Sequence, residues 1–219
     1  MRNAVRSVLS GQDLTGTRCE RKQMLLKRAL DLLGAGVLLL LLLPIFVVLA
    51  LLVALEDGRP VFYRRRVVGR GGEFDAFKFR SMCRNADAIL AADPALQREF
   101  ERNFKLERDP RVTRVGSVLR KLSLDELPQL FNVLKGQMSL VGPRMICPAE
   151  LAKYGEHKQL LMSVKPGLTG YWQVNGRQSV NYEERIQMDI HYIQHWSFCM
   201  DLKILCKTPY AVMKREGAY

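Results

Sequence analysis

An uncharged run of 24 residues, from Leu32 to Leu55, constrains the fold more than any other part of the sequence. A helix rises 1.5 Å per residue, so this run would reach about 36 Å, enough for the roughly 30 Å hydrocarbon core of a bilayer. The 219 residues contain no second run of this kind, which excludes a polytopic transporter. We therefore expect one bilayer-embedded segment, followed by a polar domain large enough to bury its own core.

The net charge is +12, and most of the positive excess flanks the apolar run. Residues 1–30 hold seven Lys and Arg against two Asp and Glu, and residues 56–80 hold seven against four. Nucleic-acid-binding proteins are also basic, but their cations need not bracket an apolar segment. Anionic lipid headgroups attract juxtamembrane cations, so we expect membrane lipid as a partner and no nucleic acid.

Two membrane topologies are consistent with the apolar run. A single span is the default for this length, but Lys and Arg mark the cytoplasmic flank of a span, and here they lie on both flanks. Pro44 lies at the middle of the run, where it removes a helical hydrogen bond and bends the helix. A re-entrant helix that bends at Pro44 and leaves through the face it entered satisfies both observations. On the residues alone, the two topologies stay equally open.

Beyond the apolar run, the pattern predicts an α+β domain that is predominantly helical. Residues 61–80 alternate partly and hold Gly69, Gly71 and Gly72, which favours a short β-hairpin over a phosphate-binding loop. Apolar residues at helical spacing predict further helices in 84–108 with a break at Asp93-Pro94, in 119–134, in 182–196 and in 202–215. For the basic, amphipathic C-terminal helices, core packing and a position in the membrane interface are both open.

Residues 122–129 (LSLDELPQ) combine acidic and apolar side chains most densely. One interpretation is helix capping, either by Ser123 with Glu126 three residues later or by Asp125 ahead of Pro128. The other is catalysis, because an ionised Asp can attack phosphorus or hold Mg²⁺. These eight residues alone favour capping. Gly- and Pro-containing turns downstream, however, present single cations in the manner of an anion-binding site.

The order of the motifs makes the sequence recognisable. From Lys27 to Tyr219, the chain closely resembles the bacterial sugar transferases, also called monotopic phosphoglycosyl transferases. The resemblance rests on Lys27-Arg28 with Asp31 and on the segments 77–82 (FKFRSM), 109–113 (DPRVT), 123–129 (SLDELPQ), 131–136 (FNVLKG), 138–144 (MSLVGPR), 165–170 (KPGLTG) and 201–204 (DLKI). So many blocks in one order make a chance match very improbable.

The resemblance implies a specific reaction. Such enzymes transfer a sugar-1-phosphate from a UDP-sugar to polyprenyl (undecaprenyl) phosphate, release UMP, and thereby begin the assembly of a bacterial glycan. It implies that Asp125 is the covalent nucleophile and that Glu126 is its partner in Mg²⁺ handling or proton transfer. Both carboxylates are expected to bind the cofactor Mg²⁺. We expect five basic residues to bind substrate: Arg80, Arg120, Arg144, Lys165 and Arg177.

The resemblance also implies a re-entrant helix-break-helix at the bacterial inner membrane, with the catalytic domain on the cytoplasmic face. Five scattered cysteines without a C-x-x-C pair agree with a reducing compartment. The chain then divides into a loose leader (1–22), a membrane helix broken near Pro44 (23–58), and a catalytic domain with interfacial helices (59–219). The oligomeric state is left open, with a homodimer as one alternative.

Three residues depart from the family's usual pattern. Leu43 precedes Pro44 where Ser is common, Gln137 stands where Asp is frequent, and Met145 replaces a usual Pro. We expect the last two to affect the nucleotide pocket without abolishing activity. A non-enzymatic, membrane-anchored basic protein that binds anionic lipid or nucleic acid is the alternative. It explains the charge and the apolar run but not the ordered motifs.

Overall fold

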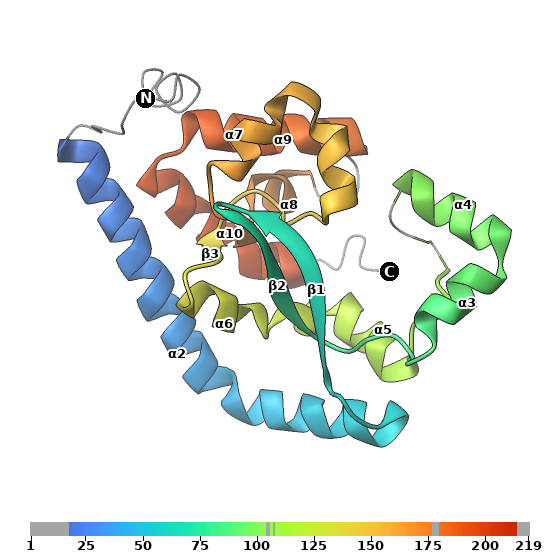
Figure 1. Cartoon of the computed structure of the whole chain (residues 1–219). Helices are drawn as coiled ribbons and strands as arrows, with labels where there is room; N and C mark the ends of the chain where they lie inside the picture. The colour runs from blue at the N-terminus through green and yellow to red at the C-terminus, as the bar shows by residue number, and fades with distance from the viewer. Residues whose placement is uncertain (1–17, 104–105, 107, 177–179, 214–219) are drawn as a thin grey trace.

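A computed structural model describes residues 18–103, 106, 108–176 and 180–213 (Figure 1). The elements in chain order are α2 (Arg18–Asp57), β1 (Phe62–Gly69), β2 (Gly72–Phe79), α3 (Ala86–Ala92), α4 (Pro94–Asn103), α5 (Arg114–Lys121), η1 (Leu124–Glu126), α6 (Gln129–Leu134), β3 (Ser139–Val141), η2 (Pro148–His157), α7 (Lys158–Met162), β4 (Gly167–Thr169), α8 (Tyr171–Asn175), α9 (Tyr182–His195) and α10 (Phe198–Met213). The predicted helical majority with a short hairpin is confirmed.

Helix α2 is a single 40-residue element that stays helical through Pro44, where the sequence predicted a break. Its two halves point in different directions, so that the helix bends around one side of the domain (Figure 1). It begins at Arg18, which makes residues 18–22 helical although the sequence placed them in the leader. By length and composition, α2 is able to cross a membrane.

One face of α2 packs against the rest of the chain on both sides of Pro44. Ala35 is buried before the proline, and Phe46, Leu49 and Val53 are buried after it at helical spacing. The opposite face exposes large apolar side chains, among them Leu33, Leu40, Leu41, Leu43, Leu51 and Leu55. An exposed apolar surface of this extent is typical of a membrane or protein interaction site.

Charged residues fasten the first part of α2 to the domain. Lys27 Nζ lies 2.6 Å from the buried carboxylate of Asp201 on α10. One turn later, the carboxylate of Asp31 accepts hydrogen bonds from Ser139 Oγ and from the backbone N–H of Leu140, both at 2.9 Å. These contacts join residues more than 100 positions apart in the sequence, so they fix the place of α2 in the tertiary structure.

The other end of α2 is fastened to the same domain. Glu56 accepts hydrogen bonds from the backbone N–H groups of Arg114 and Val115 at 2.8 and 3.0 Å, which satisfies free donors at the start of α5. Arg80 Nη2 donates to the carbonyl oxygen of Asp57 at 2.8 Å and lies 3.0 Å from its carboxylate. Both ends of the apolar helix therefore contact one body.

The predicted hairpin is confirmed. Strands β1 and β2 pair antiparallel in a register that ends at Gly69 opposite Gly72. Gly71 and Gly72 adopt φ angles of 93° and 119°, which side-chain-bearing residues rarely reach, so the glycine cluster serves the turn. A second, two-stranded sheet pairs β3 with β4 in parallel, and the sequence pattern did not predict it.

The helices over 84–108 and 182–196 are confirmed as α3, α4 and α9, whereas one helix over 119–134 is wrong. That segment holds the end of α5, the 3₁₀ turn η1 and α6. Ser123, at φ 56°, is in the left-handed region and ends the α-helical path. Periodicity had detected one apolar face, but it does not report a change of backbone conformation.

Candidate active site

The adjacent carboxylates Asp125 and Glu126 (the dyad) lie on the 3₁₀ turn η1. No side-chain hydrogen bond caps η1 at Ser123 or α6 at Pro128, so both capping interpretations are wrong. The side chain of Asp125 is buried nonetheless, with 7% of the residue exposed. A buried carboxylate without a capping role requires another compensation for its charge.

The residues on either side of the dyad pack against helix α2. Leu124 and Leu127, on either side of the two acids, pack against a buried apolar cluster that includes Phe46 and Leu49 of α2. Burial of such side chains is worth roughly 1.5–3 kcal/mol each, enough to hold a short turn in place. The two acids therefore lie directly beside the apolar helix.

Lys78 of β2 supplies the nearest positive charge. Its Nζ lies 2.6 Å from Glu126 Oε1 and 3.6 Å from Asp125 Oδ2. In the hairpin register Lys78 faces Tyr63, and Arg65 two positions further lies on the same face of the hairpin. One face of the hairpin thus presents two cations near the dyad.

The two carboxylates differ in their electrostatics. Burial raises the pKa of Asp125, while the charges of Lys78 and Arg120 act against this rise. Burial also opposes the ionisation of Glu126, but Lys78, Arg144 and Arg65 outweigh it and lower the pKa of Glu126 to about 2. Glu126 is thus held as an anion, whereas burial and the neighbouring Glu126 charge favour the protonated form of Asp125.

A cleft of about 1190 Å³ opens over the dyad, and its volume is ample for a nucleotide sugar. It is bounded by the hairpin, by the α5–η1 segment, and by α8 and α9. The basic residues that line it are Arg65, Lys78, Arg80, Arg84, Arg111, Arg120, Arg144 and Arg185. Six acids also line it, namely Asp87, Glu99, Asp109, Asp125, Glu126 and Glu150, so the basic residues exceed the acids by two. This excess of positive charge suits an anionic ligand.

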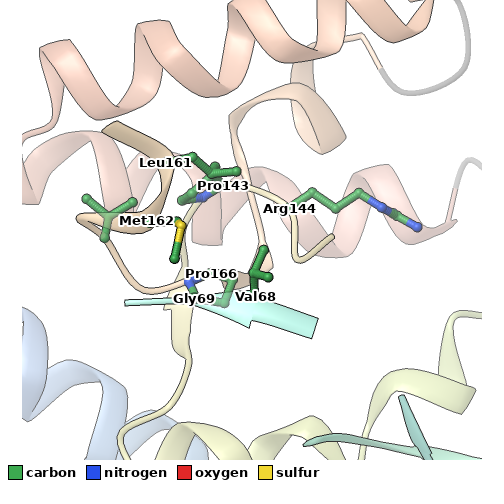
Figure 2. Close-up of a pocket in the computed structure, with 8 residues that line it drawn as sticks. Val68, Gly69, Pro143, Arg144, Leu161, Met162 and Pro166 are labelled. Carbon is green, nitrogen blue, oxygen red and sulfur yellow. The ribbon is translucent and has the colours of Figure 1, made fainter. Parts of the chain in front are cut away.

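Two of the five predicted substrate-binding residues, Arg120 and Arg144, line this cleft. Within the described structure, neither guanidinium forms an ion pair with an acidic side chain. Arg120 Nε donates to Ser81 Oγ at 2.9 Å, and burial lowers the pKa of its guanidinium while Asp125 opposes this shift. Arg144 extends away from a small apolar pocket that includes Pro143 (Figure 2). Its guanidinium carbon lies 5.4 Å from the ring centroid of Trp172.

The structure places the other three differently. Arg80 borders the cleft, but its guanidinium is engaged by the carbonyl groups of Asp57, Gly58 and Pro60. Lys165 lies beside Arg28, outside the residues that line the cleft, and burial together with Arg28 lowers its pKa. Arg177 falls outside the described residues. Substrate binding by these three stays a prediction.

The two residues expected to affect the nucleotide pocket, Gln137 and Met145, do not line this cleft. The side-chain oxygen of Gln137 accepts a hydrogen bond from Asn132 at 2.8 Å, and Met145 is buried in the main core. Their effect on nucleotide binding stays a prediction. The departures from the usual pattern are accommodated by packing.

Sequence reasoning assigned no role to Lys78, Arg65, Glu150, Tyr182 or Arg185, all of which line the cleft. Lys78 was visible as part of a motif, but its approach to Glu126 joins positions 48 apart. The other four residues come from β1, η2 and α9, and only the tertiary structure brings them together.

The dyad suits a Mg²⁺ ion whose remaining ligands would come from water and from substrate phosphate oxygens. Among the described residues, no group of three or more His, Cys, Asp or Glu could hold a metal ion by itself. Mg²⁺ in phosphate-handling sites takes one or two carboxylates together with water and substrate phosphate oxygens. Asp125 and Glu126 offer that donor set, with Lys78 hydrogen-bonded to one of the four oxygens.

Comparison with known proteins identifies the family. The family model described as "Bacterial sugar transferase" matches residues 22–215. The chain belongs to the bacterial sugar transferase family. The match runs from α2 through α10 and therefore includes every described residue that lines the cleft.

Three members of this family are similar to the chain over most of its length. "UDP-galactose-lipid carrier transferase" of Erwinia amylovora is 46% identical over 89% of the chain and 42% of the relative. "Undecaprenyl-phosphate galactose phosphotransferase" of Salmonella typhimurium is 45% identical over 91% of the chain and 43% of the relative. "Exopolysaccharide production protein ExoY" of Sinorhizobium fredii is 46% identical over 88% of both. The chain thus spans about two fifths of the first two relatives.

Proposed function

We propose that the chain transfers a sugar-1-phosphate from a UDP-sugar to polyprenyl (undecaprenyl) phosphate and releases UMP, as a first membrane step of exopolysaccharide or related glycan assembly. One observation carries the proposal: a buried aspartate, Asp125, lines a cleft together with several arginines and with the Lys-paired Glu126, and the neighbouring leucines pack against an apolar helix. The names of the relatives, which include a lipid carrier and undecaprenyl phosphate, support the choice of acceptor.

The basic residues of the cleft reduce the repulsion between the attacking carboxylate and the diphosphate of the donor. A carboxylate that approaches a diphosphate is repelled by it, and preorganised cations are the usual means of removing that repulsion. Lys78, Arg120 and Arg144 surround the dyad and provide this charge. When bound, Mg²⁺ held by the dyad and by substrate phosphate oxygens would further screen the diphosphate and stabilise the departing phosphate.

In the first step, a carboxylate oxygen of Asp125 attacks the β-phosphorus of the UDP-sugar. A bond forms between that oxygen and phosphorus, and the bond from phosphorus to the bridging oxygen breaks, so that UMP leaves with the electron pair. The sugar-phosphoryl group remains on Asp125 as an acyl phosphate. The attack needs the ionised carboxylate, which Lys78 and Arg120 favour against the effect of burial.

In the second step, a phosphate oxygen of the lipid acceptor attacks the same phosphorus. The bond to Asp125 breaks, its carboxylate is restored, and the sugar leaves joined to the lipid through a diphosphate. No external acid is required for either departure, because the leaving groups are a phosphate and a carboxylate. One aspartate thus serves both half-reactions.

We further propose that α2 is re-entrant and that the cleft lies at the cytoplasmic face of the bacterial inner membrane. The support is that Lys27 and Asp31 at one end of α2, and Glu56 at the other, all bind the same domain. A straight span would place these ends on opposite sides of a bilayer. Single cysteines replacing Lys22 and Tyr63 are expected to react with a membrane-impermeant reagent from the same side, and labelling from opposite sides would establish a span.

The reaction is tested by measuring the release of UMP in the presence of undecaprenyl phosphate and Mg²⁺. A panel of UDP-sugars serves as donors, and UDP-galactose is the first of them to be tested. Asp125→Asn is expected to reduce the rate by about 10⁴-fold or more, as losses of covalent nucleophiles do. Asp75→Asn is the matched control, because Asp75 is an exposed acid on the hairpin that pairs with Arg66. Substantial UMP release by Asp125→Asn would refute the nucleophile assignment. Vesicle binding without turnover of any UDP-sugar would favour the non-enzymatic alternative.

A further inference from the structure

The side of the cleft formed by η2 and α9 is organised around one buried carboxylate, Glu150, which the proposed chemistry does not use. Glu150 is 5% exposed. It accepts hydrogen bonds from Arg65 Nη2 at 3.1 Å, from the Cys147 N–H at 3.2 Å and from the Tyr182 hydroxyl at 3.3 Å, and Arg185 Nη2 lies 3.7 Å away. A buried anion with three hydrogen-bond donors and one further ion-pair partner holds these groups in a fixed arrangement.

This cluster carries more positive than negative charge. Within 4 Å, one carboxylate, Glu150, lies beside two guanidinium groups, Arg65 and Arg185. Within the described structure, Arg185 Nε and Nη2 are buried without a hydrogen-bond partner. The Arg185 guanidinium is also stacked on aromatic rings, 4.2 Å from the Tyr182 centroid and 5.4 Å from the Trp172 centroid. Stacking of this kind restricts the guanidinium to few orientations. This wall of the cleft, formed by η2 and α9, therefore presents an ordered guanidinium with unused hydrogen-bond donors.

The cluster faces the dyad across the cleft. The charges of Arg65 and Arg144 act on both Glu126 and Glu150, so both arginines lie near the dyad and near this cluster. Figure 1 shows α9 on the far side of the hairpin from the second half of α2, beside which the dyad lies. An in-line displacement places the leaving group opposite the attacking atom. UMP that leaves the β-phosphorus opposite Asp125 therefore departs toward this wall.

We propose that Arg65 and Arg185 bind the α-phosphate of the donor, which becomes the phosphate of UMP, and that Glu150 is a positioning residue that holds both guanidinium groups for this task. The inference rests on the proposed function and assigns the η2–α9 side of the cleft to the nucleotide. A single carboxylate shared by two guanidinium groups leaves hydrogen-bonding capacity for a phosphate, which a fully paired cluster would lack.

Glu150→Gln tests the positioning role, because glutamine keeps the size of the side chain and one oxygen that can accept from the Cys147 N–H, but removes the charge. Its amide nitrogen takes the place of the oxygen that accepts from the Tyr182 hydroxyl. We expect the Michaelis constant for the UDP-sugar and the inhibition constant of UMP each to rise about tenfold, equal to about 1.4 kcal/mol of binding free energy. The kcat value is expected to stay within about twofold, because the dyad is untouched. A loss of folded protein would lower kcat and the melting temperature and leave both constants unchanged.

Glu156→Gln is the matched control, since Glu156 lies on the same 3₁₀ helix with 88% of its side chain exposed. It is expected to leave both constants unchanged. Arg185→Gln and Arg185→Lys form a second pair, which also covers the case that Glu150→Gln does not fold. The glutamine variant is expected to weaken UMP binding, and the lysine variant to restore part of it.

Binding of UMP alone, measured by calorimetry, separates this inference from the proposed function. If the wild-type chain releases no UMP from any UDP-sugar, the proposed function fails. If UMP binds the wild-type chain and binds Glu150→Gln and Arg185→Gln more weakly, the η2–α9 side of the cleft is still supported as a nucleotide site. Unchanged UMP affinity and unchanged donor constants in both folded variants would overturn the inference.

Discussion

Lys27→Met is expected to detach the first part of α2 from the domain. Lys27 Nζ contacts Asp201 Oδ2 at 2.6 Å and the Val141 carbonyl oxygen at 2.9 Å, and Asp201 is fully buried. Without the lysine, Asp201 keeps two neutral donors among the described residues, the Tyr192 hydroxyl at 2.7 Å and the Trp196 indole N–H at 3.1 Å. Removal of one partner from a buried ion pair costs about 3–5 kcal/mol, because the remaining charge is uncompensated.

Chemical and thermal unfolding of the detergent-solubilised chain provides the assay. For a chain of this length, a loss of about 4 kcal/mol corresponds to a melting temperature lower by roughly 8–16 °C. Lys22→Met is the control, because Lys22 is an exposed cation on the same helix. Adding Asp201→Asn to Lys27→Met removes the uncompensated charge and is expected to recover part of the loss. A loss below about 1 kcal/mol, or no recovery in the double variant, would refute the reasoning.

Two further predictions concern stability. Asp189 is fully buried and accepts from the Tyr154 hydroxyl at 3.1 Å, and burial raises its pKa from 3.8 to about 7. Between these two pH values the unfolded state loses a proton that the folded state keeps, so the free energy of unfolding should fall as pH rises from 4 to 7, by up to about 4 kcal/mol. Asp189→Asn should flatten this part of a curve of stability against pH. An unchanged slope in the variant would contradict the assignment. Gly116→Ala should destabilise the fold by about 2–4 kcal/mol, because a Cβ there would lie 2.0 Å from the Ser81 carbonyl oxygen. Gly36→Ala, which meets no atom within 4 Å, should change stability by no more than about 1 kcal/mol, so equal unfolding midpoints for the two variants would dismiss the packing argument.

Local sequence signals predicted those parts of the fold that local backbone preferences determine. The glycines at 69–72 predicted the hairpin turn because positive φ angles are needed there. Asp93-Pro94 predicted the division between α3 and α4, and Asp93 indeed accepts from the Ala95 N–H at 2.9 Å. The same reasoning failed at Ser123, because an apolar periodicity continues across a left-handed residue that only tertiary packing selects.

The candidate site was predictable in its centre and not at its edges. Asp125 and Glu126 are adjacent in sequence, so a motif can identify them. Arg65 and Glu150 are 85 positions apart, and no property of either segment indicates that they meet. Capping was the favoured interpretation of the dyad from its own octapeptide. The structure excludes it because Ser123 makes no side-chain capping bond and Asp125 lies inside η1, while α6 begins after Pro128.

The attachment of α2 at both ends has a consequence for the lipid environment in which the proposed enzyme works. A helix that spans a bilayer must match its full hydrocarbon thickness, and mismatch tilts or deforms it. In the proposed re-entrant topology, Lys27 and Glu56 tie both ends of the helix to the domain, so the apolar face meets only the near leaflet. The dyad lies beside the same helix, so it stays at a constant distance from the near membrane surface. This distance does not depend on the thickness of the bilayer.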